Sequence, residues 1–156
     1  FDPATSTDNS PPTSLTACTA ASTFTGVYTE VTAMQCTVPA NCMGTRGELA
    51  YDALFGNTNE AEIKTPKVQF GATTLAAPAI TTNISYRIRQ SIQNIGLTGK
   101  QLWSDTATDG ESSAAVGTVA SNDTTTDLTF KATLTVDTNA TNQNLGMHRL
   151  ALALIA

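Results

Sequence analysis

The sequence predicts an all-β protein folded as a β-sandwich, and three features of the chain lead to this prediction. Charged residues make up 13% of the 156 residues, against roughly 25% in an ordinary soluble domain. Threonine takes their place with 29 residues, and this β-branched residue suits the pleated surface of a sheet better than a helix. About seven short segments with strand patterns follow one another with turn residues between them, which is typical of a sandwich.

The clearest strand patterns lie in residues 127–136 and 83–92, where apolar and polar residues alternate. This alternation is typical of a strand with one face in the core. In the first segment we expect these residues to point inward: Leu128, Phe130, Ala132, Leu134 and Val136. In the second we expect Ile84, Tyr86, Ile88 and Ile92 to point inward, and Ser85, Arg87, Arg89 and Ser91 to point outward. The predicted core brings together Ile84, Tyr86, Ile88, Phe130, Leu134 and Leu152.

The other predicted strands are shorter or less regular. Residues 67–71 form a short strand, and residues 97–112 hold another around Leu102 and Trp103 before a turn at Asp109-Gly110. Residues 146–156 carry apolar side chains on both faces, so we expect both faces of this strand to be covered. Residues 23–34 alternate loosely and form a strand or a hairpin.

One short helix is predicted near residues 47–55. Leu49, Ala53 and Leu54 would share one face of this helix, and Gly56 lies where a helix often ends with a glycine. Its length allows two turns at most.

The chain divides into an extended N-terminal arm, residues 1–22, and a single sandwich domain, residues 23–156. Residues 1–16 are rich in Pro, Ser, Thr and Asp and have no core-forming pattern. The sequence starts FDPATSTDNS, which we interpret as a mature N-terminus left after removal of a signal peptide. We therefore expect an extracellular, cell-surface protein.

The chain has three cysteines, Cys18, Cys36 and Cys42, so one is left over if a single disulfide forms. The short stretch between Cys36 and Cys42 contains Pro39 and Asn41, which favours a turn. We predict a disulfide between Cys36 and Cys42, and Cys18–Cys36 across a hairpin is the alternative.

Charge and length exclude several classes of partner. The net charge is −5, and Arg87 and Arg89 are the only close basic pair, so a nucleic-acid partner is not expected. The longest apolar run has seven residues, far fewer than the roughly 20 that span a bilayer.

No catalytic, metal or cofactor motif is present, and we predict that the protein is not an enzyme. The nucleophile elbow and the phosphate-binding loop are missing, and the single histidine, His148, lies in a strand pattern. Asp105, Asp109 and Glu111 suggest a solvated turn more than a calcium loop. Two carboxylates that meet in the fold would still allow a glycosidase pair. Trp103 is expected in the core, and a sugar-stacking platform is the alternative.

Three Asn-x-Ser/Thr sequons, at Asn83, Asn122 and Asn139, are candidate glycosylation sites. Asn122 and Asn139 lie in polar segments where a glycan could fit, whereas Asn83 begins a predicted strand.

Residues 67–156 resemble the spore-coat-U and archaic chaperone–usher pilins. The shared features are the VQFG strand, the ISYRI strand, an LW strand before a DG turn, and a final strand that begins at a glycine. The resemblance implies an incomplete immunoglobulin-like sandwich that a strand from a neighbouring subunit completes.

These features predict a structural subunit of an extracellular filament, a pilus or fibre, in which copies of the chain exchange strands. The donated strand would lie within residues 1–34, unless this segment folds back onto its own sheet. The alternatives are a secreted carbohydrate-binding or adhesion domain, with the site in loops near Trp103, and a virion coat protein of jelly-roll type.

Overall fold

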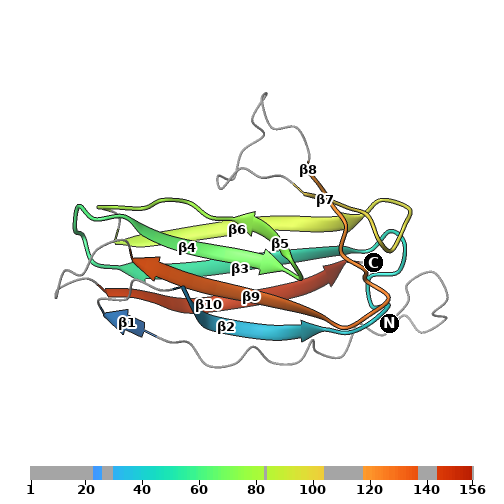
Figure 1. Ribbon diagram of the computed structural model, residues 1–156, viewed down its shortest axis with the longest axis horizontal. Helices are drawn as coiled ribbons and strands as arrows, with labels where there is room; N and C mark the ends of the chain where they lie inside the picture. Colours follow the sequence, from blue (N-terminus) through green and yellow to red (C-terminus); the bar gives the residue numbers. More distant parts are fainter. Residues whose placement is uncertain (1–22, 26–29, 83, 104–117, 137–143, 156) are drawn as a thin grey trace.

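A computed structural model describes residues 23–25, 30–82, 84–103, 118–136 and 144–155. These residues form ten strands in two antiparallel sheets (Figure 1). The predicted all-β class is therefore confirmed. The residues that the structure describes include no helix that is long and apolar enough to cross a membrane.

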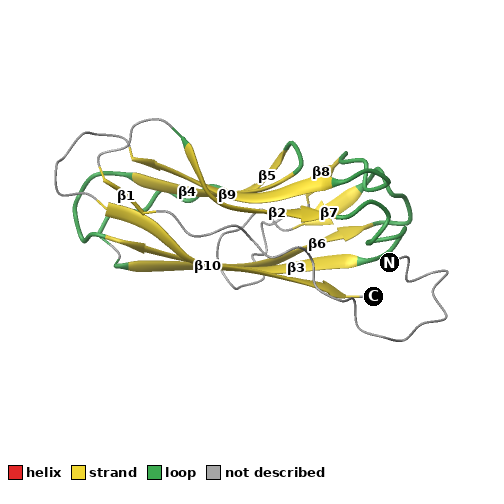
Figure 2. Ribbon diagram, turned by 90° about the horizontal axis from the view of Figure 1, so that it is seen from below, coloured by secondary structure: helices red, strands yellow, loops and turns green. Residues whose placement is uncertain are grey.

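The six-stranded sheet has the spatial order β1 (Thr23–Thr25), β10 (Asn144–Ile155), β3 (Glu48–Asn57), β6 (Ser85–Asn94), β7 (Gln101–Trp103) and β8 (Thr118–Ala120). The four-stranded sheet has the order β2 (Val31–Val38), β9 (Leu128–Val136), β4 (Lys64–Phe70) and β5 (Thr73–Ala76). Figure 2 shows the two sheets from the side, with β4 and β9 in one layer and β3 and β10 in the other. The core lies between the layers, as in a β-sandwich.

Strand β9 confirms most of the predicted inner face of residues 127–136: Phe130, Ala132, Leu134 and Val136 are buried, Leu128 is half-buried, and Thr133 on the opposite face is buried as well. Phe130 is fully buried, and its ring lies 5.2 Å from the ring of Tyr51 and 6.1 Å from that of Phe70. These rings come from β9, β3 and β4, so Phe130 joins the two sheets. Leu134 is also buried, as predicted, while Leu152 is half-buried and packs against the core.

Strand β6 confirms part of its predicted inner face. Ile88 and Ile92 are fully buried, and Tyr86 is half-buried against the core. Ile84 is 71% exposed, so its predicted burial is wrong. The reason is that β6 begins only at Ser85, and Ile84 precedes it in the connection, where its carbonyl accepts a hydrogen bond from Asn57 N at 2.9 Å.

The predicted helix near residues 47–55 is wrong, because this segment forms the central strand β3. Its inner face buries Leu49, Tyr51, Ala53 and Phe55, which alternate with half-buried residues. β10 and β6 pair with β3 along its length. Tertiary pairing on both sides therefore overrides the short helix-like spacing of Leu49, Ala53 and Leu54.

A buried polar network ties the loops together at the end of the sandwich where β3 begins. Asn94 Nδ2 donates to Gly44 O at 2.6 Å and to Thr124 Oγ1 at 2.9 Å. Gln101 Nε2 donates to Asn94 Oδ1 and to Asn122 O, both at 2.9 Å. Each amide is buried yet satisfied, as buried polar groups need to be.

Candidate functional site

The strongest candidate for a functional site is an open sheet edge along β10. On one side β10 pairs with β3 from Leu145 to Ile155. On its other side β10 pairs with β1 only at Asn144, Leu145 and Gly146. Within the described ranges, the stretch from Met147 to Ile155 thus has a sheet partner on one side only.

The first part of this edge, Met147 to Arg149, has features that usually discourage the addition of another strand. A β-bulge interrupts the register between Met147 and Arg149, and His148 and Arg149 are exposed. His148 lies over Gly56, where a Cβ would overlap the imidazole ring. Bulges and charges protect natural sheet edges. From Leu150 to Ile155 the edge has no charge, Pro or Gly, so this part remains suited to another strand.

Strand β2 provides a second long edge beside the first. Among the described strands β2 pairs only with β9, and it contacts β10 across the two sheets. Val31 and Met34 on β2, with Leu152 and Leu154 on β10, are only partly buried against the core. An added strand on this side could therefore cover apolar surface as well as backbone groups.

The structure describes part of the predicted donor segment, residues 1–34. Thr23–Thr25 pairs with β10 of the same chain, and Val31–Val38 pairs with β9 of the same chain. These parts of residues 1–34 fold back onto their own sheets. Residues 1–22 and 26–29 lie outside the described residues, and the donation of a strand to a neighbouring copy stays a prediction.

The predicted disulfide between Cys36 and Cys42 is not formed in the structure, although both residues are buried. Cys36 lies on β2, and its Sγ is 3.8 Å from the carbonyl oxygen of Phe130 on β9. Cys42 lies in the turn after β2, and burial raises the pKa of its thiol. Cys36 faces inward as part of β2, which continues to Val38 before the chain turns toward Cys42. Cys18 lies outside the described residues.

Of the three sequons, the structure describes only Asn122, and it makes this site unsuitable for a glycan in the folded protein. Asn122 is buried, its Nδ2 donates to Thr73 Oγ1 at 3.0 Å, and its Oδ1 accepts from Ala72 N at 3.3 Å. A glycan on Nδ2 would need this buried nitrogen to face solvent. Asn83 and Asn139 lie outside the described residues.

Trp103 is buried on β7, opposite Ile92 of β6. Its indole is therefore part of the core, as predicted, and is not available as a sugar-stacking platform. The carboxylates Asp105, Asp109 and Glu111 lie outside the described residues.

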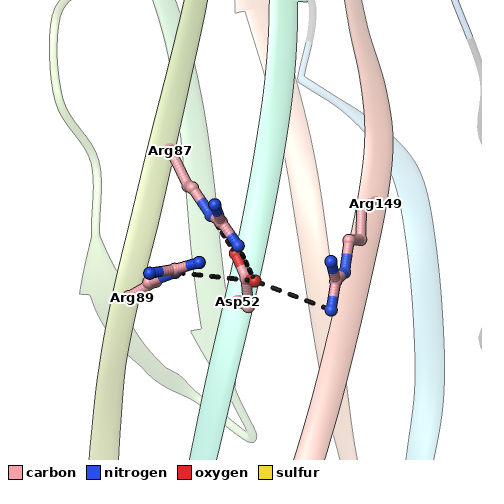
Figure 3. Close-up of polar contacts among 4 residues, drawn as sticks. All are labelled: Asp52, Arg87, Arg89 and Arg149. Carbon is pink, nitrogen blue, oxygen red and sulfur yellow. Dashed lines mark hydrogen bonds and ion pairs between the residues drawn. The ribbon is translucent and has the colours of Figure 1, made fainter.

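A second feature is an arginine cluster on the outer face of the six-stranded sheet, made of Arg87, Arg89 and Arg149 around Asp52 (Figure 3). Arg87 holds the Asp52 carboxylate with two hydrogen bonds, one from Nε to Oδ1 at 2.7 Å and one from Nη2 to Oδ2. Arg89 Nε and Arg149 Nη2 each lie 3.7 Å from Asp52 Oδ2. The hydrogen bonds from Arg87 hold the pKa of Asp52 below its usual value.

The sequence indicated only the two arginines of β6 in this cluster. The helix prediction for residues 47–55 hides the position of Asp52, and no local pattern places Arg149, in residues 146–156, beside that segment. In β3, Asp52 is directly opposite Arg89 of β6, and the strand on its other side is β10, which carries Arg149. Strand pairing between segments that are far apart in the chain was the missing information.

The described residues contain no group of three or more His, Cys, Asp or Glu that could hold a metal ion. Comparison of the chain with protein-family models, with curated proteins and with solved structures gave no match. The resemblance to pilins therefore stays a prediction.

Proposed function

We propose that the protein is a structural subunit of an extracellular filament, in which a strand from one copy adds to the β10 edge of the next. The observation that supports this most is the uncharged edge from Leu150 to Ile155, which lacks a described partner on one side. Main-chain hydrogen bonds along such an edge supply affinity, and side chains at alternate positions supply specificity. The low charge and high threonine content fit a protein that packs against its own copies.

The register of β1 supports the residues just before it as the donor. Thr23 pairs with Gly146 and Thr25 with Asn144. A strand that continues this antiparallel register would place residues 14–22 opposite residues 147–155, or residues 15–22 if the bulge at His148 leaves one residue of β10 without a partner on this side as well. Residues 13–22, TSLTACTAAS, carry no charge and no Pro, whereas Pro11 and Pro12 come directly before them. Proline cannot donate to a ladder, so the pairing segment and the open edge end together.

The same register could be filled by the chain's own residues 14–22, which would close the monomer. The same contacts are then made within one copy or between two, as in domain swapping. We propose the exchange between copies, which produces a head-to-tail contact and an open filament when the rotation does not close.

Deleting residues 1–22 tests the donor, because this deletion leaves every described strand intact. We expect the full chain to form fibres in negative-stain micrographs and the shortened chain to form none. A synthetic peptide of residues 13–22 should bind the shortened chain and raise its melting temperature. Fibres from the shortened chain that match those of the full chain would refute strand lending.

Ala153→Lys tests the edge, since Ala153 is exposed on β10 and a lysine on an edge strand discourages strand addition. Gln93→Lys is the matched control: it adds the same charge to the same outer face, but Gln93 lies between β3 and β7. We expect Ala153→Lys to abolish fibres and Gln93→Lys to retain them. Equal effects of the two substitutions would contradict the β10 edge as the assembly site.

The sugar-binding alternative loses its main support, because the indole of Trp103 is buried.

A further inference from the structure

The arginine cluster concentrates positive charge in an acidic protein. It holds three of the eight Lys and Arg residues of the chain together with one Asp, so its charge is +3 − 1 = +2, whereas the whole chain has −5. The rest of the chain therefore carries −5 − 2 = −7. A surface with this contrast attracts an acidic partner, and the protein's own remaining surface is acidic.

The strand register shows what surrounds the cluster on the outer face. Leu54 lies in one row between Arg149 and Arg87, and the next row holds Asp52 with Ala151 and Arg89. The row after that holds Ala50, Ala153 and Ser91. These small side chains leave the arginines accessible from that flank, and the side chains of Arg87, Arg89 and Arg149 are 41%, 52% and 56% exposed.

Two of the three arginines keep hydrogen-bonding capacity for a partner. Arg89 and Arg149 lie at ion-pair distance from Asp52 but beyond hydrogen-bond distance of it. A guanidinium has five N–H donors in a planar fork that matches a carboxylate. A second carboxylate that approaches Asp52 from solvent would therefore meet two guanidinium groups from opposite sides (Figure 3).

The best complement among the described residues is the acidic loop, residues 58–63, between β3 and β4. It carries Glu60 and Glu62 and the exposed Ile63. The loop is held from inside by Lys64, which is fully buried and whose Nζ donates to Glu60 O at 3.0 Å, Glu62 O at 3.0 Å and Thr81 O at 3.1 Å. The backbone of both glutamates is thereby fixed, which lowers the entropy lost when their side chains bind.

The other described carboxylates are less suitable for such a contact. Glu30 binds Lys67 and Thr133, Asp123 binds Thr125, and Asp127 accepts from Ala40 N. Glu48 is directly opposite Gln93 on the same outer face as the cluster. Among the described residues, the exposed Glu60 and the half-buried Glu62 are therefore the pair that lies on another surface without a side-chain partner.

We infer that the arginine cluster of one copy binds the acidic loop of a second copy. Leu54 next to the arginines and Ile63 next to the glutamates add an apolar contact to the charged one, which is the mixture found in protein interfaces. The two surfaces differ, so the contact is heterologous and can propagate. The inference rests on the proposed filament, since the contact would join its subunits, but it uses a different surface from the β10 edge.

Charge exchange in the full chain tests this contact by sedimentation velocity. The variants are Arg149→Glu, Glu60→Lys and the combination of both, with Arg46→Glu as a control that makes the same charge change at an exposed turn outside the cluster. At roughly 50 mM NaCl we expect each single change to weaken self-association about tenfold or more, because close charge pairs across an interface couple strongly. The combination should restore self-association to within about threefold of the parent, as a double-mutant cycle requires for a direct pair.

Several outcomes would overturn the contact. It is refuted if the combined variant associates no better than the single ones, if Arg46→Glu weakens association as much as Arg149→Glu, or if the parent stays monomeric at low salt. A polyanion would be the partner instead if two results occur together. The parent binds a sulfated polysaccharide and Arg149→Glu does not, and the combined variant fails to restore self-association.

The same measurements separate this contact from the proposed filament. Fibres that are lost in Ala153→Lys but are unchanged by the charge exchange would leave the filament standing and refute the arginine contact. The opposite result is self-association that is lost in the single charge variants, restored in the combined one and weaker at roughly 300 mM NaCl, where screening is stronger. If this association occurs without fibres, it would support the contact and refute the filament.

Discussion

Replacing Lys64 by Met is the sharpest test of how the end of the sandwich is held together. Lys64 begins β4 with its side chain fully buried, and its Nζ donates to three backbone carbonyls, two from the acidic loop and one from Thr81. Methionine has a similar length but no donor. The substitution therefore leaves three carbonyls without their partner while it fills nearly the same space.

The expected loss of stability follows from two opposing effects. Each hydrogen bond from a charged donor contributes roughly 1.5–3 kcal/mol, and an unpaired buried acceptor costs about 1–3 kcal/mol. Against this, methionine removes the desolvation penalty of a buried ammonium, which is several kcal/mol. The loop carbonyls can also turn partly toward water. We expect a net loss of about 3 kcal/mol.

Urea denaturation measures this loss, and Lys67→Met is the matched control three residues along β4. Lys67 forms an exposed ion pair with Glu30 at 2.5 Å, and exposed pairs contribute about 0.2–1 kcal/mol. Cleavage by a glutamate-specific protease at Glu60 or Glu62 should become faster in Lys64→Met alone. If the two lysine variants unfold at the same urea concentration, the three carbonyl contacts do not hold the loop.

Three further predictions concern the core, the outer face and a turn. Phe130→Ala should lower the free energy of unfolding by about 4 kcal/mol and Leu102→Ala, at an exposed position, by less than about 1 kcal/mol; similar urea midpoints would contradict the position of Phe130 between the sheets. The pKa of Asp52 is lower in the folded protein than its ordinary value of 3.8. Its carboxylate therefore stabilises the fold at pH values above 3.8, and this contribution is lost as the pH falls through the lowered pKa. Asp52→Asn should therefore be less stable than the parent at neutral pH, with the two melting temperatures converging in acid; a constant difference across pH would refute this. Gly47→Ala should destabilise by about 2 kcal/mol, because a Cβ there would overlap a backbone carbonyl, whereas Gly99→Ala, with open space around it, should leave the melting temperature unchanged.

The strands that the sequence predicted well are those whose alternation reflects one buried face. In β9 the period of two extends from Leu128 to Val136, and the structure buries four of the five residues on the predicted side, with Leu128 half-buried. The same rule failed at Ile84, because a pattern cannot show where a strand begins. Ile84 has the identity and the phase of an inner residue, but it precedes β6.

The features that the sequence did not predict depend on partners far away in the chain. In β3, Leu49, Tyr51, Ala53 and Phe55 also follow a period of two, and this was the signal that could have replaced the helix assignment. Asn94 and Gln101 are polar and occur near turn residues, so nothing local indicated their burial. Their burial is made possible by loop carbonyls and by Thr124, which no local pattern places beside them.

The central positions of β9 and β10 have a consequence for how the chain folds. β9 lies between β2 and β4, and β10 lies between β1 and β3, so each sheet needs a strand that is synthesised late. Cys36, for example, meets Phe130 across a separation of 94 residues. Such non-local pairing raises the contact order, and proteins of this kind fold in milliseconds to seconds. Until β9 and β10 are in place, β2 lacks its described partner and β3 is paired only with β6, which exposes the newly made chain to premature association with its copies.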